Sequence, residues 1–184
     1  MKIAKLLIVY SSKHGHTARI AHRMADAAAT IEGVQTTVWS VDDATEGHVA
    51  LADLFIIAGP VHFEHHDRKL ERFVREHLGV MAARSSAFAS VSGQMASFGG
   101  STRAEELADK FLEATGWIPD RVGLFAGGIP YTRYGFILRW VMRRIASRYG
   151  LDTDSSRDYD YTDWEAVDRF AREFVTAELA ASAA

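Results

Sequence analysis

The sequence predicts a three-layer α/β fold, in which a doubly wound parallel sheet of five strands is covered by helices on both faces. Short apolar runs alternate along the chain with segments of helical spacing, which is typical of right-handed βαβ crossovers. The central apolar runs are nearly continuous, as expected of strands buried on both faces. At 184 residues, the chain is expected to form a single domain, residues 1–184.

Composition excludes several classes of protein. The formal net charge is −3, so no basic field is available to bind nucleic acid. The chain has no cysteine, which excludes disulfides and Cys-ligated metals. No apolar stretch approaches the roughly 20 residues that span a bilayer. The short apolar run within Met1 to Tyr10 is expected to be a buried strand and not a signal peptide.

The first half of the chain supplies three of the predicted strands. Residues 3–10 form the first, and a helix is expected from His16 to about Ile31, because apolar residues recur there at helical spacing. Residues 34–40 alternate and carry β-branched side chains, which favours an edge strand. The run 54–60 is a buried strand that ends in Gly-Pro.

A loop at residues 62–67 is expected to lead into a helix capped by Asp67. Its buried face would carry Leu70, Phe73, Val74 and Leu78. Residues 86–92 form another central strand, followed by a Gly- and Ser-rich loop at 93–101. Thr102 and Glu105 have the spacing of a capping box for the next helix.

The last third adds one strand and two helices. Gly116 is expected to end the preceding helix, and residues 122–129 form the fifth strand. Residues 134–149 and 164–179 have helical spacing, the second with Thr162 and Glu165 as its capping box. Five strands with intervening helices are the count of the flavodoxin-like sheet, in which ligands bind at the carboxyl ends of the strands. The loops expected there are 11–17, 59–67 and 92–101.

The loop after the first strand has the form of a phosphate site. Backbone N–H groups and the positive end of a helix meet an anion in such strand–loop–helix sequences. Ser12-x-His14-Gly15-x-Thr17 resembles the flavodoxin phosphate loop, although that family usually has Thr at the position of His14. The alternative is an ordinary βα turn with a Ser/Thr cap. The resemblance implies that FMN phosphate is bound by Ser12, Lys13, His14, Gly15, His16 and Thr17.

Two further loops are expected to hold the flavin ring. In flavodoxin-like proteins the loops after the third and fourth strands carry the isoalloxazine, which needs backbone donors at its edge and flat cover over its faces. Phe63, His62 and Phe98 could supply that cover, although local packing is an equal alternative. The residues assigned to the ring are Pro60, Val61, His62, Phe63, Ser92, Gly93, Gln94 and Phe98.

Three motifs in the second half of the chain resemble those of one particular family among the flavodoxin-like proteins. They are Trp117-x-Pro119-Asp120, Phe125-Ala126-Gly127-Gly128-x-x-Tyr131-x-Arg133-Tyr134 and Tyr161-Thr162-Asp163-Trp164-Glu165. In this order and spacing they resemble the flavodoxin-type, menaquinone-dependent protoporphyrinogen IX dehydrogenases of haem biosynthesis. The resemblance covers nearly the whole chain. One departure is Gln94 to Arg103, which is Gly- and Ser-rich where a member of that family carries a basic, proline-containing insert.

The resemblance implies an enzyme that removes six electrons from protoporphyrinogen IX and passes them to a membrane quinone, menaquinone or ubiquinone. The chemistry takes place at N5 of FMN, so no catalytic side chain and no metal is expected. It also implies a cytoplasmic protein, peripheral on the inner face of the cell membrane. The oligomeric state stays open, a homo-oligomer included. Two alternatives are a flavodoxin-type electron carrier or quinone reductase, and a flavin-free phosphate-binding module.

Two segments keep alternative interpretations. His62, His65 and His66 would exchange protons near the flavin or contact porphyrin carboxylates, or they form a solvated loop. The segment 131–149 carries five arginines and no acid. Its residues Tyr134, Ile137, Leu138, Val141, Met142 and Ile145 are expected to share one face, which packs on the sheet or enters lipid. Substrate or membrane contacts are predicted for Arg133, Phe136, Trp140 and Arg143.

Overall fold

The computed structural model describes residues 3–97, 100–148 and 150–182. Its strands are β1 Ala4–Tyr10, β2 Val34–Ser40, β3 Leu54–His62, β4 His65–His66, β5 Ser85–Ser92, β6 Arg121–Ala126, β7 Gly128–Ile129 and β8 Tyr159–Asp160. Its α-helices are α1 His16–Ala29, α2 Glu46–Leu51, α3 Arg68–Glu76, α4 Leu78–Ala82, α5 Gly100–Thr115, α6 Phe136–Arg148 and α7 Trp164–Ser182. Short 3₁₀ turns occupy Gly93–Ala96 and Tyr131–Arg133.

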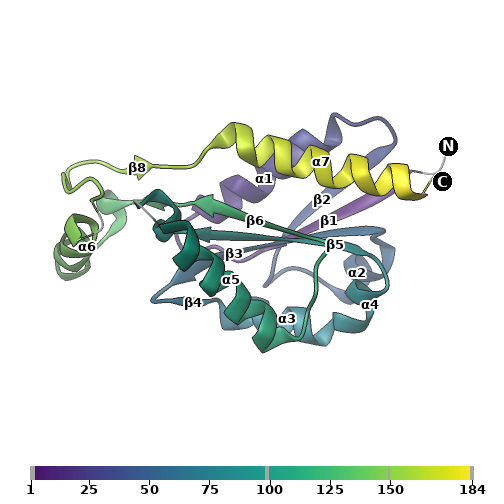
Figure 1. Cartoon of the computed structure of the whole chain (residues 1–184), viewed down its shortest axis with the longest axis horizontal. Helices are drawn as coiled ribbons and strands as arrows, with labels where there is room; N and C mark the ends of the chain where they lie inside the picture. The colour runs from purple at the N-terminus through teal and green to yellow at the C-terminus, as the bar shows by residue number, and fades with distance from the viewer. Residues whose placement is uncertain (1–2, 98–99, 149, 183–184) are drawn as a thin grey trace.

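The predicted fold class is confirmed. The main sheet has the order β2-β1-β3-β5-β6, and these strands pair in parallel. The switch in strand order lies between β1 and β3, where a doubly wound sheet binds its ligand. Strand β2 is at the edge, as its alternating sequence predicts. Helices α1 and α7 cover one face of the sheet, and α3 and α5 cover the other (Figure 1).

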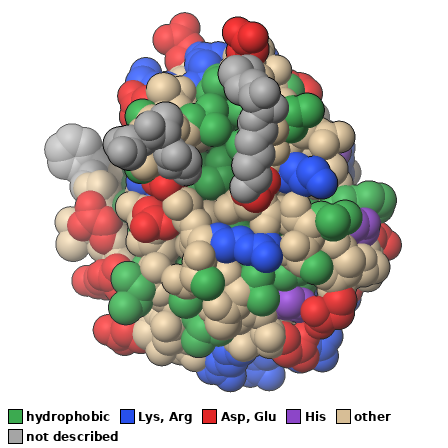
Figure 2. Space-filling model, turned by 90° about the vertical axis from the view of Figure 1, so that its right-hand side faces the viewer, with side chains coloured by type: hydrophobic (Ala, Val, Ile, Leu, Met, Phe, Trp, Pro, Cys, Tyr) green, Lys and Arg blue, Asp and Glu red, His purple; other side chains and the backbone are tan. Residues whose placement is uncertain are grey.

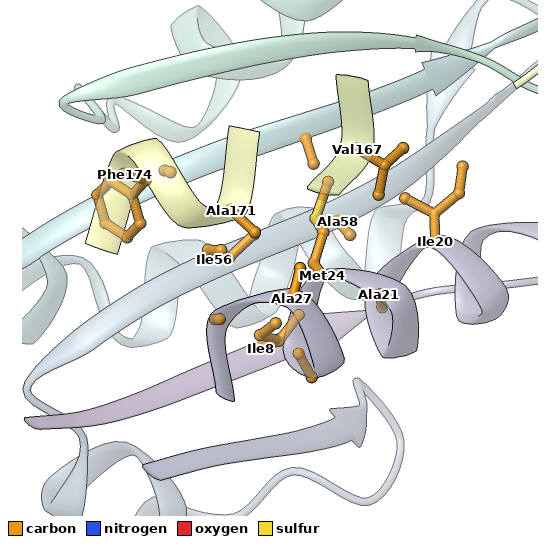
Figure 3. Close-up of a cluster of buried hydrophobic side chains, with 14 of the residues drawn as sticks. Ile8, Ile20, Ala21, Met24, Ala27, Ile56, Ala58, Val167, Ala171 and Phe174 are labelled. Atoms are coloured by element: carbon orange, nitrogen blue, oxygen red, sulfur yellow. The ribbon is translucent and has the colours of Figure 1, made fainter. Parts of the chain in front are cut away.

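Each face of the sheet buries its own apolar cluster, because successive strand residues point to opposite faces. Ile8 and Ile56 face α1 and α7, where Met24 and Phe174 complete the cluster (Figure 3). On the other face, Phe88 stacks on Phe111 with ring centroids 4.7 Å apart. The two clusters fix the sheet between its helical layers and set the positions of the loops at its ends.

Two predicted helix caps are wrong, although α7 begins at Trp164 as predicted. Helix α5 begins at Gly100, so Thr102 lies inside its first turn and is not its cap. At α7 the Thr162 hydroxyl is engaged elsewhere: it donates to the carbonyl of Ala126 and lies 2.7 Å from His16 Nε2. Asp163 caps this helix instead, by accepting the N–H of Ala166. At α7 the cause is a tertiary contact of Thr162, which overrides the local capping pattern.

The segment 62–67, predicted as a loop, is a β-hairpin. Strand β3 continues to His62 and pairs antiparallel with β4. The two turn residues, Phe63 and Glu64, have φ of 49° and 65°. Neither is glycine, so the left-handed backbone stores strain of about 1 kcal/mol or more at each. The strain is held at the edge of the predicted ligand site.

Helix α6 does not pack on the sheet, which corrects one of the two predicted alternatives. It lies beside the carboxyl ends of the strands, at the end of the molecule away from both termini (Figure 1). A small core holds it there, formed by Ile129, Tyr131, Tyr134 and Ala146 with flanking residues. Ile137, expected on the packed face, is instead 78% exposed.

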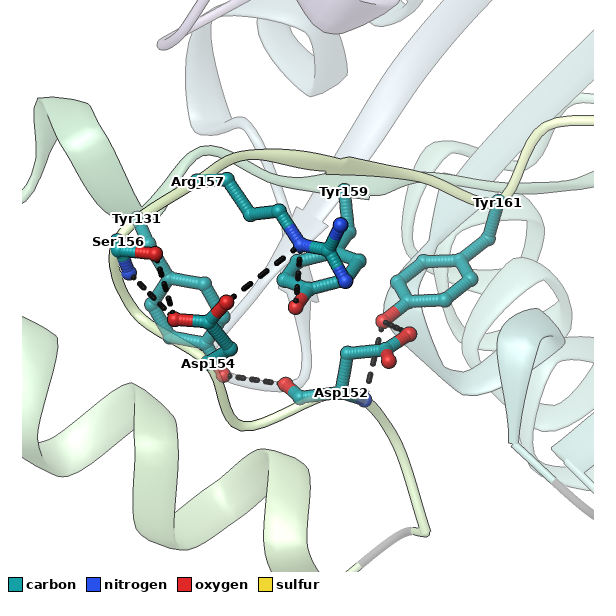
Figure 4. A network of polar contacts seen from close by, with 7 residues as sticks. All are labelled: Tyr131, Asp152, Asp154, Ser156, Arg157, Tyr159 and Tyr161. Carbon is teal, nitrogen blue, oxygen red and sulfur yellow. Dashed lines mark hydrogen bonds and ion pairs between the residues drawn. The ribbon is translucent and has the colours of Figure 1, made fainter.

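A polar network ties the chain after α6 back to this small core (Figure 4). The Tyr131 hydroxyl donates to the Asp152 carbonyl at 2.8 Å, and the Tyr161 hydroxyl donates to the Asp152 carboxylate at 2.8 Å. Arg157 lies 5.0 Å from the Tyr159 ring centroid and pairs with Asp154. Strand β8 pairs with β7 beyond this turn, so the predicted strand 122–129 divides after Ala126 into two strands.

The buried imidazole of His66 predicts a pH-dependent stability. Its Nε2 lies 3.0 Å from Ser90 Oγ, and burial, followed by the charge of His62, lowers its pKa to about 4. In the unfolded chain this imidazole binds a proton near pH 6.5, so its titration does not change the free energy of unfolding above pH 6.5. Below that pH the free energy of unfolding decreases, by up to about 3 kcal/mol at pH 4. Urea unfolding at several pH values checks this.

The matched variants are His66→Gln, which keeps a hydrogen-bonding side chain without the titration, and His65→Gln at the exposed neighbour. The free energy of unfolding is expected to decrease less between pH 6.5 and pH 4 in His66→Gln than in wild type. In His65→Gln the decrease is expected to equal that of wild type. Equal slopes in wild type and His66→Gln would contradict the assignment.

Candidate cofactor site

A cavity of about 490 Å³ opens at the carboxyl ends of the strands. Four segments that follow β1, β3, β5 and β6 line it, and α6 forms a further wall. The lining residues are Ser12, Lys13, His14, His16, Thr17, Pro60, Val61, His62, Phe63, Glu64, Val91, Ser92, Gly93, Gln94, Gly127, Gly128, Ile129, Pro130, Tyr134, Leu138, Met142, Ile145, Ala146, Arg148 and Leu151.

The loop after β1 presents backbone donors to this cavity. Gly15 has φ of 85°, a left-handed conformation that favours glycine, and its N–H donates to Ser12 Oγ at 3.1 Å. Helix α1 begins at the next residue without a side-chain cap on its N-terminus. Its first N–H groups are therefore available to an anion, and the helix dipole favours negative charge there.

The hydroxyl groups of this loop are also available. Thr17 is 2% exposed, and its hydroxyl has no hydrogen-bond partner among residues 3–97, 100–148 and 150–182. Ser12 Oγ accepts the Gly15 N–H, which leaves its own proton to donate. Two hydroxyl donors and uncapped amides fit a phosphate dianion.

Arg133 holds the loop from outside. Its Nη1 donates to the His14 carbonyl at 2.6 Å, so the guanidinium braces the backbone next to the anion position. The His14 ring meets Tyr134 edge-on at 5.4 Å. Burial and the charges of Lys13 and Arg133 lower the pKa of His14, and burial raises the pKa of Tyr134 to about 12. Both side chains are therefore neutral near pH 7.

The β3–β4 hairpin forms the wall opposite the phosphate loop. His62 lies edge-on to His14, with ring centroids 5.9 Å apart, and burial followed by the charge of His14 lowers its pKa. Phe63 is 76% exposed at the cavity mouth. Glu64 reaches Arg103 of α5 at 2.7 Å, which links the hairpin to the helix after β5. An aromatic side chain held this way can cover a flat ring.

The loop after β5 supplies an orphaned polar atom. Ser92 lies at the end of β5, and its Oγ is buried with no partner in the described part of the chain; Ser11 Oγ, at the end of β1, is in the same state. Buried hydroxyls without partners are rare and point to a ligand. Gly93 and Gln94 follow in a 3₁₀ turn. The predicted ring residue Phe98 lies outside the described residues.

Gly128 closes the remaining side. A Cβ atom at this position would lie 2.7 Å from the Tyr159 carbonyl oxygen and 3.0 Å from His16 Nδ1. Any larger residue would therefore displace β8 or the His16 ring. Burial lowers the pKa of His16, against the opposing charge of Asp160, so this ring, too, is neutral near pH 7.

The three loops predicted from sequence therefore meet around one cavity. Of the predicted cofactor residues that the structure describes, all line it except Gly15, which shapes the loop. Arg133, Phe136, Trp140 and Arg143 do not line it. The wall that sequence reasoning missed comes from Gly127–Pro130, Tyr134 and the α6 residues Leu138, Met142 and Arg148. The sequence signals for this wall were the motif that contains Gly127, Gly128 and Tyr134 and the apolar face of the helix, and neither was assigned to the cofactor site.

No group of three or more His, Cys, Asp or Glu side chains is placed to hold a metal ion within 3–97, 100–148 and 150–182. None of the described helices is both long and apolar enough to pass through a bilayer.

Comparisons with known proteins agree with this geometry. Residues 7–156 match the family model described as flavodoxin domain. The chain is 32% identical over 177 residues to a protoporphyrinogen IX dehydrogenase (quinone) of Leishmania major, covering 96% of this chain and 77% of that one. It is 32% identical over 170 residues to the protein of the same name from Escherichia coli K12, covering 92% and 93%. An archaeal flavodoxin structure superposes with a TM-score of 0.56 at 16% identity, covering 94% and 97%.

Proposed function

The chain belongs to the flavodoxin family and binds FMN, and we propose that it oxidises protoporphyrinogen IX to protoporphyrin IX with a membrane quinone as acceptor. The observation that carries the proposal is the likeness to dehydrogenases of that name over nearly the full length of both chains. When bound, FMN supplies the acceptance of a hydride equivalent and the return of electrons.

The residues of the cavity are assigned by their chemistry. Ser12 and Thr17 hydroxyls, with the uncapped amides of α1, bind the phosphate. The hairpin residues Pro60 to Phe63 and the turn Ser92 to Gln94 enclose the ring, where Ser92 Oγ gains the partner it lacks. Phe63 at the mouth excludes water from the ring face. The neutral His14 and His62 add no charge near the reacting atoms.

The charge around the cavity favours an enzyme over a soluble electron carrier. Carriers of the flavodoxin type are usually strongly acidic around the flavin, where they dock on basic partners. Here the lining contains Lys13 and Arg148, and its one acid, Glu64, is ion-paired with Arg103. The apolar wall from α6 extends the site beyond what a small carrier needs.

We further propose that the outer face of α6 rests on a membrane. Phe136 is 87% exposed, Ile137 78% and Trp140 58%, and Arg144 lies 5.8 Å from the Trp140 ring centroid. No acid occurs in this helix. At the opposite end of the molecule, by contrast, acidic and basic side chains are interspersed (Figure 2). Aromatic residues beside arginines suit an interface with anionic headgroups.

Replacing Phe136 and Trp140 together by serine is expected to reduce binding to anionic vesicles at least about 10-fold, because two buried aromatic side chains are lost from the interface. Sedimentation with phosphatidylglycerol vesicles measures this, while FMN stays bound. The matched control replaces Leu51 and Ile118, exposed apolar residues on other elements, by serine. Equal sedimentation of wild type and Phe136→Ser/Trp140→Ser would remove the membrane assignment.

Anaerobic half-reactions test the proposed function. Mixing the FMN-loaded protein with protoporphyrinogen IX is expected to bleach the flavin absorbance, and a menaquinone analogue is expected to restore it. If protoporphyrinogen does not reduce the flavin, although the quinone reoxidises the reduced flavin, the proposed substrate is wrong. The protein would then be a quinone reductase that acts on another substrate.

A further inference from the structure

Helix α6 carries a second apolar face, distinct from its outer one. Leu138, Met142 and Ile145 line the same cavity as the phosphate loop. Leu138 and Met142 are half-buried, and Ile145 is 38% exposed. These three recur at helical spacing, so they form one continuous apolar strip. Phe136 and Trp140, which face outward, do not line the cavity.

The strip is only partly used in packing within the chain. Leu138 and Met142 pack against the small core beneath α6, yet both stay half-buried, and together with the more exposed Ile145 they remain open to the cavity. A flat apolar ligand that covered it would remove this surface from water, which stabilises a complex by about 25 cal/mol per Å². The strip therefore has the character of a binding wall.

A cation without a partner stands at the end of this wall. Arg148 lines the cavity in the last turn of α6 and makes no ion pair or hydrogen bond within the described residues. It lies about 18 Å along the helix from Phe136, whereas Arg133, in the turn before α6, is already bound to the His14 carbonyl. Arg148 is thus free to pair with an anionic group of a second ligand.

We propose that this inner wall of α6 binds the tetrapyrrole substrate, with the ring against Leu138, Met142 and Ile145 and a propionate carboxylate on Arg148. The inference rests on the proposed function and adds the residues that select the substrate. Charge favours this occupant: a neutral quinone headgroup gains only a hydrogen bond to its carbonyl from Arg148, whereas a carboxylate gains both an ion pair and a charge-assisted hydrogen bond.

The test uses the FMN-loaded protein and the product, protoporphyrin IX, whose binding is followed by its fluorescence. A parallel titration uses the dimethyl ester, which has no free carboxylate. Arg148→Gln is expected to weaken binding of the free acid about 10-fold and to leave the ester unchanged. Met142→Ser is expected to weaken both forms. Arg169→Gln, the same change at an exposed arginine of α7 that does not line the cavity, is the matched control and leaves both unchanged.

Several outcomes would overturn the inference. Equal affinities for acid and ester in wild type and Arg148→Gln would remove the carboxylate contact. If Met142→Ser increased only the KM for the menaquinone analogue, the inner wall of α6 would be assigned to quinone binding. Both results leave the proposed function intact if protoporphyrinogen still reduces the flavin. A wild-type protein that binds no porphyrin and is not reduced by protoporphyrinogen would overturn the inference and the proposed function together.

Discussion

Replacing Ser12 and Thr17 together by alanine is expected to weaken FMN binding by about 100-fold or more. Each hydroxyl is placed to donate to a phosphate dianion, and a hydrogen bond to a charged group contributes about 1.5–3 kcal/mol. Ser12 also accepts the Gly15 N–H at 3.1 Å, so its loss loosens the loop as well. Titration of the apoprotein against the fluorescence of free FMN gives the dissociation constant.

The control for this double variant removes two threonine hydroxyls from other surfaces, Thr37→Ala on β2 and Thr176→Ala on α7. Both residues are exposed, so FMN affinity should not change. An unaltered affinity in Ser12→Ala/Thr17→Ala would mean that the phosphate is bound elsewhere, and the assignment of the loop would fail.

Replacing Phe88 by alanine is expected to lower the free energy of unfolding by about 3–5 kcal/mol. Phe88 is fully buried, stacks on Phe111 and meets Trp117 edge-on at 5.7 Å. Its removal leaves a cavity between β5 and α5 that rigid neighbours cannot fill. Urea denaturation measures the loss.

Phe136→Ala is the matched control, because the same side chain is 87% exposed there. Its effect on unfolding is expected to stay within about 0.5 kcal/mol. Similar losses in the two variants would contradict the assignment of Phe88 to the core of the sheet.

The sheet and its loops were predictable because their signals are local. The apolar run before Tyr10 and the single Gly15 ahead of a helical pattern place a phosphate site with little help from the rest of the chain. The crossover rule gives the handedness of the connections in a parallel sheet, and the flavodoxin resemblance gives the order of its strands. These features depend on backbone chemistry that the sequence displays directly.

Other features depend on contacts between distant segments. The hairpin turn Phe63–Glu64 lacks the Gly or Asn that marks a left-handed turn, and it is held in place by Arg103 of α5. The cap of α7 shifts to Asp163 because Thr162 is drawn to His16 and Ala126. No local pattern contains these partners.

The position of helix α6 at the site also depends on contacts that its own sequence does not contain. Helical spacing identifies an apolar face, but it does not say whether a sheet, a lipid surface or a ligand covers it. The structure gives α6 its own small core and turns Leu138, Met142 and Ile145 toward the cavity. One wall of the site is therefore formed by a helix face that was expected, from the sequence, to pack on the sheet or to enter lipid.

The most direct measurement is anaerobic turnover. The FMN-loaded protein is incubated with protoporphyrinogen IX and a menaquinone analogue, and porphyrin fluorescence is followed with time. Protoporphyrin is expected to form at a rate that depends on the protein, on its FMN and on the quinone together. Porphyrin formation no faster than in a control without protein would contradict the proposed reaction.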